Sequence, residues 1–278
     1  MDNHYENLLS LLKGLKSVLV AFSGGVDSSL LLAASRDALG ESVLAVTAKS
    51  PLIPHEDLLR AQEIAAWLRA RWMTVEAHDL EDPFFRDNPP DRCYACKRKL
   101  FSALLQLAER EGLSHVIEGT HAGDLGDYRP GLRALREMGI QSPFVEVGID
   151  KSEIRQLARD RGLKNWDQPS AACLASRIPY GEPITREKLH RVSQCEQLLH
   201  GLGFTQVRVR DHGALARIEL SPVELKHVLE EQILSAIVCG CKERGYAYVT
   251  LDLQGYRTGA MNETLTDGEK NEAGREGI

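Results

Sequence analysis

The residues with the clearest chemical capacity form a glycine-rich turn close to the N-terminus. A short apolar, β-branched segment over residues 17–22 ends in the run Ser23-Gly24-Gly25-Val26-Asp27-Ser28. Glycines let a backbone approach an anion closely, and N–H groups at the start of a following helix point toward it. Ser23 and Ser28 can add hydroxyl donors, and Asp27 can hold Mg²⁺ or place a leaving pyrophosphate. The run predicts a phosphate-binding loop, with an ordinary strand-to-helix turn as the alternative.

Cysteines form a second set of residues with possible chemistry. Cys93 and Cys96 make a CxxC pair that we place in a loop entering a helix, and Cys173 lies in the segment ACLASRIPYG. Two thiolates three residues apart can ligate one soft metal centre, but such a pair serves redox, zinc and iron–sulfur sites alike. Cys173 can join them only if folding brings it close. The remaining cysteines are interpreted as small buried apolar residues: Cys195, Cys239 and Cys241.

Two further segments hold candidates for ligand binding. In the sequence VRVR, strand alternation puts Arg208 and Arg210 on one face, where two guanidinium groups suit a phosphate. A solvated strand face or a salt bridge between subunits is the alternative. Residues 118–124, EGTHAGD, close a predicted strand and should face the same crevice as the glycine-rich turn. We place Thr120 and Asp124 near a bound nucleotide, with a purely structural turn as the alternative.

The pattern of apolar residues predicts the scaffold for these groups. Strand-like runs over residues 17–22, 43–47, 72–77 and 115–118 alternate with helical runs over 27–40, 55–70 and 97–112. This alternation predicts an α/β fold with a doubly wound parallel sheet, whose ligands bind beyond the carboxyl ends of the strands. Residues 80–96 contain three prolines and are predicted to form an ordered loop.

The pattern changes near residue 180, where turn residues precede a new amphipathic helix. We predict helices over residues 185–202 and 222–244 and strands over 205–211, 214–220 and 246–253. The chain is therefore divided into an α/β domain over residues 1–180, a smaller α+β domain over 181–265 and a disordered tail over 266–278.

Composition excludes several classes of protein. The chain has 278 residues, of which 43% are hydrophobic, and 34 Lys and Arg against 40 Asp and Glu give a net charge of −6. This balance disfavours nucleic acid as a partner. The N-terminus lacks the pattern of a signal peptide, and no uninterrupted apolar run approaches the ~18 residues of a membrane span. We expect a cytoplasmic protein without a membrane partner, in which six cysteines are not a disulfide framework.

The string SGGVDS, in its strand–turn–helix setting, resembles the signature of the PP-loop (N-type ATP pyrophosphatase) superfamily. Members include GMP synthetase, asparagine synthetase, NAD synthetase and several tRNA thiolases. The resemblance implies that ATP, with Mg²⁺, is cleaved between its α- and β-phosphates, so that a substrate is adenylated and pyrophosphate is released. It also implies that the end of the second strand, at Val46, Thr47 and Ala48, frames adenine through its backbone. No GxxxxGK[ST] motif is present, so no Walker loop is implied.

Over residues 1 to about 265, the order of SGGVDSS, CYACKRKLF, EGTHAGD, ACLASRIPYGEPIT and VRVRDHG resembles the LarE family of ATP-dependent sulfur transferases. These enzymes adenylate a carboxylate of pyridinium-3,5-biscarboxylic acid mononucleotide and convert it to a thiocarboxylate during synthesis of the nickel-pincer nucleotide cofactor. Some members sacrifice the sulfur of one cysteine at the position of Cys173. Members with the additional CxxC hold a [4Fe-4S] cluster with three thiolates.

The resemblance therefore implies a cluster held by Cys93, Cys96 and Cys173, with sulfide on its open iron delivered to the acyl-adenylate. Sulfide itself or an upstream sulfur donor would supply the cluster. Structural zinc, or separate thiols with Cys173 sacrificed, are the alternatives.

The LarE resemblance also implies roles for other residues. In that family, arginines of the VRVR strand bind the substrate's nucleotide phosphate. From its place close to Cys173 in the sequence, rather than from the resemblance, Arg177 is a candidate to steady the adenylate or the cluster. Independently of the resemblance, we expect Glu196 to lie on an exposed helix face, with a role in a metal site as the alternative. The family pattern has Asn at the position of His121 and Asp at that of Gly123, so this chain departs from it there. A homo-oligomer, a hexamer built from trimers with the C-terminal domain in its contacts, is also implied.

Three other functions compete with a sulfur transferase. A PP-loop tRNA thiolase would show a basic surface groove and salt-sensitive tRNA binding. A glutamine-fed synthetase would need an amidotransferase domain, which the sequence lacks. A non-catalytic ATP or iron–sulfur sensor would bind without turnover, so pyrophosphate release with candidate carboxylates separates it from an enzyme.

Overall fold

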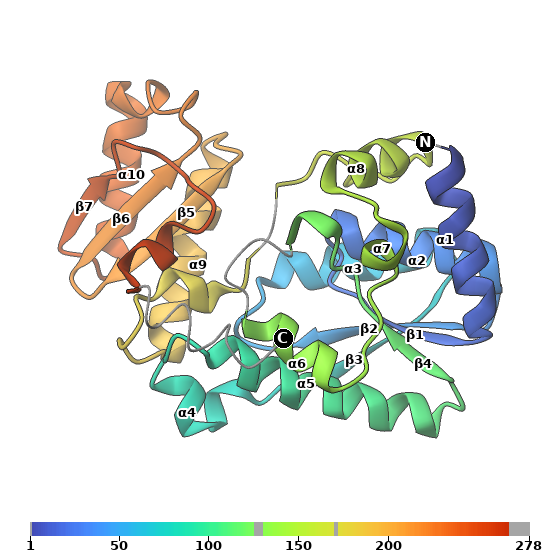
Figure 1. Ribbon diagram of the computed structural model, residues 1–278. Helices are drawn as coiled ribbons and strands as arrows, with labels where there is room; N and C mark the ends of the chain where they lie inside the picture. The colour runs from blue at the N-terminus through green and yellow to red at the C-terminus, as the bar shows by residue number, and fades with distance from the viewer. Residues whose placement is uncertain (1, 125–129, 170–171, 267–278) are drawn as a thin grey trace. The chain divides into compact units, whose positions relative to one another are not determined.

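The computed structural model describes residues 2–124, 130–169 and 172–266, which form two compact units (Figure 1). The first unit holds residues 2–78 and 91–169, and the second holds 79–90 and 172–266. The sequence placed a boundary after residue 180, whereas the second unit already includes residues 172–180 and the separate stretch 79–90. The tail for which disorder was predicted lies outside the described residues, apart from Thr266.

The first unit contains a four-stranded parallel sheet in the order β3-β2-β1-β4. Its strands are β1 (Val18–Ala21), β2 (Val43–Lys49), β3 (Arg71–Glu76) and β4 (His115–Ile117). Val18 pairs with Val43 on one side and with His115 on the other. The chain moves outward from β1 to β3 and then returns to β4 beside β1, so the strand order reverses between β1 and β4. This arrangement confirms the predicted doubly wound sheet, and a ligand crevice belongs at the carboxyl ends of β1 and β4.

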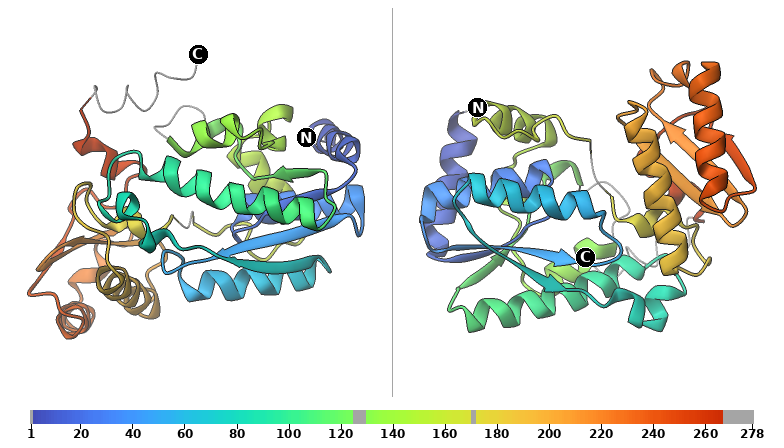
Figure 2. Two further views of the ribbon diagram at one scale, coloured as in Figure 1. Left: turned by 90° about the horizontal axis from the view of Figure 1, so that it is seen from below. Right: turned by 180° about the vertical axis from the view of Figure 1, so that it is seen from behind.

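Helices cover both faces of this sheet (Figures 1 and 2). The first unit contains α1 (Asp2–Leu15), α2 (Val26–Leu39), α3 (His55–Trp67), α5 (Arg92–Arg110), η2 (Ala122–Asp124), α6 (Pro130–Glu137), α7 (Pro143–Val147) and α8 (Lys151–Asp160). Alternation along β1 directs its side chains to both layers, because Val18 and Val20 pack with α1, α2, α3 and α8 while Leu19 packs with α5. Burial of both faces explains the continuous apolar runs of β1 and β2.

The second unit is a small mixed sheet with helices packed on it, which confirms the predicted α+β region. Strands β5 (Val207–His212) and β6 (Leu215–Leu220) are antiparallel, and β7 (Tyr248–Leu251) pairs with β6 in parallel. The other elements are η1 (Asp79–Glu81), α4 (Pro83–Arg86), η3 (Leu174–Arg177), α9 (Arg186–Gly201), η4 (His227–Leu229), α10 (Glu231–Glu243) and η5 (Ala260–Thr264). Side chains of α9, α10 and all three strands form one apolar core.

Asn88 fastens the stretch 79–90 to the rest of the second unit. It is fully buried, and its Nδ2 donates hydrogen bonds to Pro179 O at 2.7 Å and Glu182 O at 2.9 Å. Its φ of +59° is a conformation that asparagine tolerates better than most residues. Gly181 N donates to Asn88 O at 3.0 Å. The backbone and the side chain of Asn88 therefore both bind residues 179–182, which follow Cys173 in the chain.

Several predicted elements were wrong in detail. The predicted loop over residues 80–96 contains η1 and α4, and α5 begins at Arg92 rather than near Lys97. Asp82 caps α4 by accepting a hydrogen bond from Phe84 N, and Pro83 lies in the first turn, where proline is compatible with a helix. These two residues favour a helix in a segment whose prolines had suggested a loop. Cys93 and Cys96 therefore lie at the start of a helix. The predicted helix over 222–244 begins only at Glu231, and α1, α6, α7 and α8 were not predicted.

In the described part of the chain, no helix combines the length and apolar character that crossing a membrane requires.

Candidate functional site

The predicted phosphate loop connects β1 to α2 at the edge where the strand order reverses. Its two serines face each other, with Ser23 Oγ and Ser28 Oγ 3.1 Å apart. Ser28 Oγ donates to Gly25 O at 3.1 Å, and Gly25 N donates to Ser23 Oγ at 3.3 Å. These bonds hold the turn in a compact form. The loop therefore presents the start of α2, with Val26 and Asp27 in its first turn, as a site for an anion.

Gly24 and Asn165 fix the backbone of this loop. Gly24 has a φ of +75°, and a Cβ at this position would lie 3.0 Å from the backbone of Ala61 in α3. Asn165 is buried, and its Nδ2 donates to both Gly24 O and Ser29 Oγ at 3.0 Å. The carbonyl of Gly24 is thereby held inward, toward Asn165. Asn165 was not predicted from the sequence, because no local pattern links it to a turn 141 residues earlier.

Asp27 forms an ion pair with Lys151, the first residue of α8. Lys151 Nζ lies 2.5 Å from Asp27 Oδ1 and 2.7 Å from Oδ2, and both side chains are about 30% exposed. Asp150 caps the same helix by accepting from Glu153 N at 2.9 Å. A phosphate bound at the loop would compete for the ammonium, and Mg²⁺ would compete for the carboxylate. Lys151 was also not predicted from the sequence.

The segment after β4 packs directly on the phosphate loop. A Cβ at Gly119 would lie 3.2 Å from both Asp27 C and Ser28 N. The neighbouring Glu118 is buried and accepts hydrogen bonds from Thr120 N at 3.1 Å and Thr120 Oγ1 at 2.8 Å. The hydroxyl of Thr120 is therefore engaged in bracing this segment, while its proposed contact with the nucleotide stays a prediction.

Ala48 lies next to the last residue of β2, at the same edge of the sheet. It is partly buried and pairs with Val75. Phe22 N donates to Val46 O at 2.8 Å, which joins the end of β1 to this strand. The position agrees with a backbone contact to adenine, although that role stays a prediction.

The three cysteines predicted to share a cluster lie in different units. Cys93 is exposed in the first turn of α5, and Cys96 is partly buried one helical turn later, both in the first unit. Cys173 is exposed just before η3, in the second unit. Within the ranges that the structure describes, no group of three or more His, Cys, Asp or Glu side chains is arranged to hold a metal ion. The cluster stays a prediction.

The other cysteines differ from one another. Cys195 and Cys241 are fully buried, as predicted, and a hydrogen bond between them, followed by burial, raises the pKa of the Cys195 thiol. Cys239 was predicted to be buried, and this is wrong, because it is exposed on α10 and donates to Glu243 Oε1 at 3.5 Å.

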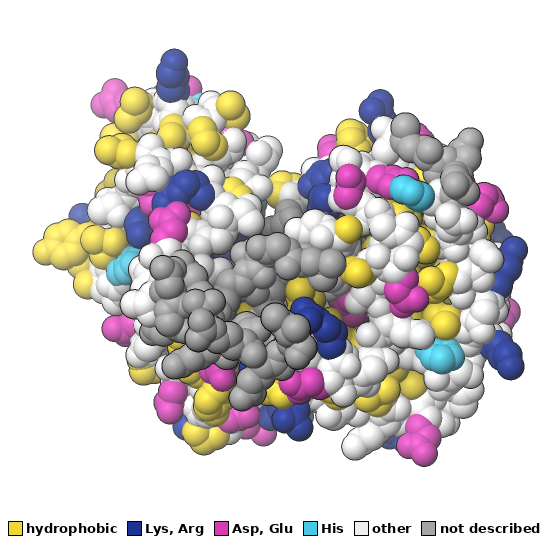
Figure 3. All heavy atoms as spheres, viewed as in Figure 1, with side chains coloured by type: hydrophobic (Ala, Val, Ile, Leu, Met, Phe, Trp, Pro, Cys, Tyr) yellow, Lys and Arg dark blue, Asp and Glu magenta, His cyan; other side chains and the backbone are white. Residues whose placement is uncertain are grey.

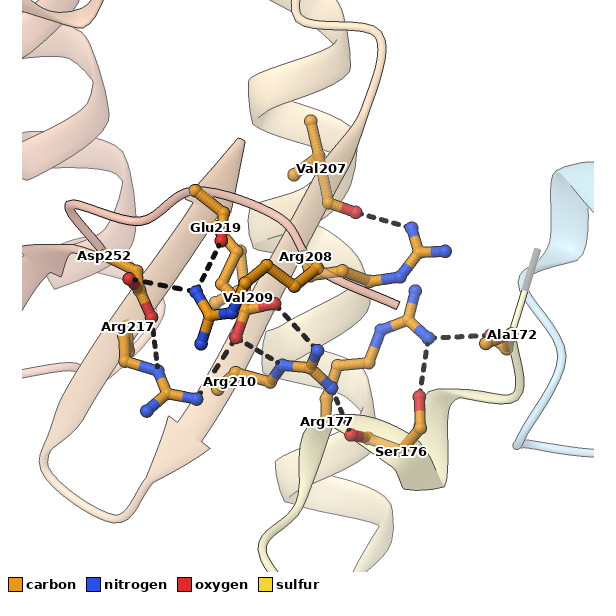
Figure 4. Close-up of polar contacts among 12 residues, drawn as sticks. Ala172, Ser176, Arg177, Val207, Arg208, Val209, Arg210, Arg217, Glu219 and Asp252 are labelled. Atoms are coloured by element: carbon orange, nitrogen blue, oxygen red, sulfur yellow. Dashed lines mark hydrogen bonds and ion pairs between the residues drawn. The ribbon is translucent and has the colours of Figure 1, made fainter. Parts of the chain in front are cut away.

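Arg177 organises the backbone around Cys173 (Figure 4). Its Nη1 donates to Ala172 O at 2.7 Å and to Cys173 O at 3.2 Å. Its Nε and Nη2 bind the two oxygens of Glu196, each at 2.8 Å. Burial lowers the pKa of Arg177, but Glu196 and, less strongly, Cys173 raise it, and the net effect is upward. Arg177 is thus a fixed cation that holds the segment containing Cys173.

Glu196 is not on an exposed helix face, so that prediction was wrong. Its side chain is buried, and Oε1 also accepts a hydrogen bond from Val209 N at 2.9 Å. The buried pair with Arg177 joins α9 and β5 to η3. With its oxygens bound in this way, Glu196 is positioned to orient Arg177 rather than to ligate a metal.

Arg208 and Arg210 lie on the same face of β5, as predicted, but this face is buried rather than solvated. Arg210 makes a bidentate pair with Glu219 at 2.9 and 2.7 Å and donates to Ser176 O at 2.6 Å. The guanidinium of Arg208 lies beside that of Arg177 (Figure 4) and over the ring of Tyr256. Burial, and then the charge of Arg177, lower the pKa of Arg208 to about 10. An anion would relieve this clustering of cations.

Comparisons with known proteins identify the family. No family model matches the chain. The chain is 42% identical over 266 residues to an uncharacterised protein of Synechocystis sp.. The matched region covers 96% of this chain and 99% of that protein. It is 38% identical over 262 residues to pyridinium-3,5-bisthiocarboxylic acid mononucleotide synthase of Lactiplantibacillus plantarum, covering 93% of this chain and 94% of the synthase. The chain belongs to the LarE family.

Membership of the LarE family confirms the prediction of an enzyme. The chain is also 27% identical over 198 residues to one of the polypeptides of a glutamine-hydrolysing GMP synthase from Thermoplasma volcanium, covering 66% of this chain and 63% of that polypeptide. This second similarity supports the PP-loop superfamily, which implies ATP and Mg²⁺ as cofactors.

The structure links His121 and Gly123, the two positions at which the resemblance implied Asn and Asp. A Cβ at Gly123 would lie 3.2 Å from both Cε1 and Nδ1 of His121. The imidazole therefore occupies space that a larger residue at position 123 would need. Asp124 accepts from His121 N at 3.2 Å, and its other oxygen lies 3.5 Å from His121 Nε2. Histidine and glycine at these positions form one packed unit.

Replacement of Asn165 by Ala should weaken ATP binding about tenfold, because the carbonyl of Gly24 loses its buried donor and the loop relaxes. Asn165→Asp should weaken it further, since a carboxylate would face that carbonyl. Isothermal titration with a non-hydrolysable ATP analogue measures both. Gln156→Ala, on the exposed side of α8, is the control and should bind normally. Unchanged affinity in both Asn165 variants would contradict this role.

Replacement of Arg208 by Met should raise the free energy of unfolding by about 1 kcal/mol, because it removes a buried cation whose charged form is disfavoured. Arg210→Met should lower it by about 2–3 kcal/mol, since Glu219 would stay buried with Arg217 as its remaining ion-pair partner among the described residues. Urea unfolding of the ligand-free protein measures both. A shift of both variants in the same direction would refute the distinction between the two arginines.

Proposed function

We propose that this LarE protein is an ATP-dependent sulfur transferase of nickel-pincer nucleotide synthesis. It adenylates a carboxylate of pyridinium-3,5-biscarboxylic acid mononucleotide and converts that group to a thiocarboxylate. The observation that carries the proposal is the 38% identity, over 93% of the chain, to pyridinium-3,5-bisthiocarboxylic acid mononucleotide synthase. The glycine-rich loop at the reversal of strand order supports it, because free N–H groups at the start of a helix suit the phosphates of a nucleotide.

In the adenylation step, a substrate carboxylate oxygen attacks the α-phosphorus of ATP, and the bond from that phosphorus to the oxygen bridging the β-phosphate breaks. The loop N–H groups and the Ser23 and Ser28 hydroxyls bind the phosphates. Lys151, paired with Asp27 in the free protein, can donate to the leaving pyrophosphate once Asp27 binds the metal. Mg²⁺ supplies neutralisation of the charge on that leaving group. The residues of the first unit thus bind and orient both ends of the reacting bond.

Binding of the substrate's phosphate is assigned to the second unit. Arg208 carries a positive charge that burial and the charge of Arg177 disfavour. The favourable electrostatic energy of a phosphate beside it is therefore larger than that of a phosphate beside an exposed arginine. Arg210 is already neutralised by Glu219 and supports Ser176 through its backbone oxygen. We therefore assign the stronger contribution to Arg208, with Arg210 and Arg177 shaping the site.

In the sulfur-transfer step, sulfide adds to the acyl carbon of the adenylate, and AMP leaves with the former carboxylate oxygen. We assign Cys93, Cys96 and Cys173 as the thiolates that hold a [4Fe-4S] cluster. Exposure of Cys93 and Cys173 and the helical spacing of Cys93 and Cys96 fit such a ligand set. When bound, the cluster supplies an open iron position for hydrosulfide. The reducing cytoplasm, where we place the protein, would keep these thiols available.

The test is anaerobic turnover with ATP, Mg²⁺, sulfide and the biscarboxylic mononucleotide, followed by mass spectrometry of product and protein. More than one thiocarboxylate per chain is expected, with the mass of the protein unchanged. Loss of about 34 Da, the mass of H₂S, with at most one product per chain would instead identify Cys173 as a sacrificed sulfur source.

Cysteine variants make this test specific. Cys93→Ser and Cys173→Ser should each lose bound iron and sulfide after anaerobic reconstitution, whereas the exposed Cys239→Ser should retain both. Full iron and sulfide content with full activity in Cys173→Ser would overturn the ligand assignment. Absence of pyrophosphate release with any candidate carboxylate would overturn the enzyme's proposed reaction.

We also propose that the protein is a homo-oligomer with contacts in the second unit. Large apolar side chains of this unit are highly exposed: Val223 at 87%, Leu229 at 73%, Tyr248 at 66% and Leu253 at 87%. Hydrophobic side chains gather on the surface of this unit in the view of Figure 3. In the described sheet, β7 is an edge strand that pairs with β6. Exposed apolar residues beside an open strand edge favour association.

Light scattering should therefore give a molar mass that is a multiple of the 30.9 kDa chain. The double variant Val223→Glu, Leu253→Glu should reduce this mass, because it charges the exposed apolar surface. Leu59→Glu, a matched change at an exposed apolar position of the first unit, should leave it unchanged. A wild-type mass of one chain would exclude the oligomer.

A further inference from the structure

His121 carries a buried polar atom without a hydrogen-bond partner among the described residues. The residue is 7% exposed, and its Nδ1 makes no hydrogen bond. Buried polar atoms are almost always satisfied within a folded protein, because leaving one unpaired costs about 1–3 kcal/mol. An unpaired nitrogen in a segment that packs on the phosphate loop therefore points to a partner that arrives with the ligand.

The carboxylate of Asp124 fixes what kind of partner this nitrogen needs. Asp124 accepts from the backbone N of His121, and its second oxygen faces Nε2 at 3.5 Å. A carboxylate beside one ring nitrogen keeps the hydrogen on that nitrogen. In the neutral ring Nδ1 is then a hydrogen-bond acceptor, and its partner must be a donor.

Contacts on both sides place the segment that carries His121 between the phosphate loop and the start of α8. Two residues earlier, Gly119 packs against the backbone of Asp27 and Ser28. One residue later, Ala122 N donates to Ile149 O at 3.3 Å, just before Asp150 and Lys151. Lys151 in turn binds Asp27. The segment that carries the ring is thus adjacent to the loop that holds Asp27, the carboxylate assigned to the metal.

We propose that Nδ1 of His121 accepts a hydrogen bond from a water molecule bound to the Mg²⁺ of MgATP. Mg²⁺ keeps several of its waters in protein sites, and these waters are hydrogen-bond donors. The phosphate oxygens of ATP are acceptors, so they cannot satisfy an acceptor nitrogen. His121 is then a positioning residue that distinguishes metal-bound from metal-free nucleotide. This inference rests on the ATP binding of the proposed function and adds a specific contact to it.

Two amide variants separate the ring nitrogens. The δ oxygen of Asn stands about where Nδ1 stands, whereas the polar atoms of Gln stand about where Nε2 stands. His121→Asn should therefore keep the affinity for a Mg²⁺-bound, non-hydrolysable ATP analogue within about twofold of the natural protein. His121→Gln should lose about tenfold. Without Mg²⁺, in EDTA, both variants should bind the analogue like the natural protein.

A third variant displaces the ring without removing it. Gly123→Ala would place its Cβ 3.2 Å from Nδ1 and Cε1, so it should weaken binding of the Mg²⁺ complex and spare metal-free binding. Isothermal titration measures all of these affinities. Pulsed electron paramagnetic resonance of the Mn²⁺ complex, with ¹⁵N-labelled histidine, should show a weak coupling through an intervening water.

Three outcomes would overturn the inference while the proposed function stands. The first is an equal loss of affinity for the metal-bound and the metal-free nucleotide in His121→Gln, and the second is no loss of affinity for either form. The third is a strong ¹⁵N coupling, which would signal direct ligation of the metal by the ring. If the natural protein binds neither form of the nucleotide, the adenylation step of the proposed function fails as well, and the two results are thereby distinguished.

Discussion

Backbone packing at the reversal of strand order is the constraint on which the proposed nucleotide site depends. Gly24 lies against the backbone of Ala61, and Gly119 lies against the backbone of Asp27 and Ser28. A side chain at either glycine would require the neighbouring backbone to move by a few tenths of an ångström, and at Gly24 it would also be strained by the φ of +75°. With Asn165 holding the carbonyl of Gly24, three segments that are far apart in sequence define one loop conformation. The N–H groups at the start of α2 can serve as a phosphate site only while this packing holds.

The second unit relies on a different principle, because its site is organised by buried ion pairs. Arg177 with Glu196 and Arg210 with Glu219 are bidentate and almost fully buried. Such pairs add little to stability compared with apolar residues, since both charges must be desolvated. Their geometric demands do fix the conformation of η3, as both arginines donate to its backbone or to the residues just before it. Cys173 is thereby positioned by electrostatics in a segment with little regular structure.

Local patterns predicted the parts of the fold that local interactions decide. The strand over 17–22, the glycine run and the following helix could be predicted, because apolar periodicity and glycine conformations act within a few residues. Arg208 and Arg210 were placed on one face for the same reason. Their burial could not be foreseen, since it depends on Glu219 and on residues 172–177. The start of α5 was missed because two prolines precede Asp91, although proline is compatible with the residues before a helix.

The contacts of Asn165 and Lys151 with the phosphate loop could not be predicted from the sequence. Each reaches the phosphate loop across more than 120 residues, and neither lies in a motif of its own. Only the strand order, which brings β4 and the chain after it back beside β1, makes these contacts possible. Glu196 was assigned to an exposed face by helical periodicity, and a single buried partner, Arg177, reverses that assignment.

The proposed cluster and the alternative of a sacrificed cysteine assign different tasks to the three thiols, of which Cys93 and Cys96 lie in the first unit and Cys173 in the second. Cys93 and Cys96 lie at the start of α5, where the positive end of the helix favours an anionic iron–sulfur centre. Arg177 donates a hydrogen bond to the backbone oxygen of Cys173 at 3.2 Å and so fixes the backbone of this cysteine. A route that takes sulfur only from Cys173 would not involve the thiols of Cys93 and Cys96 in α5. A cluster uses all three, and each of them is at least partly accessible to solvent.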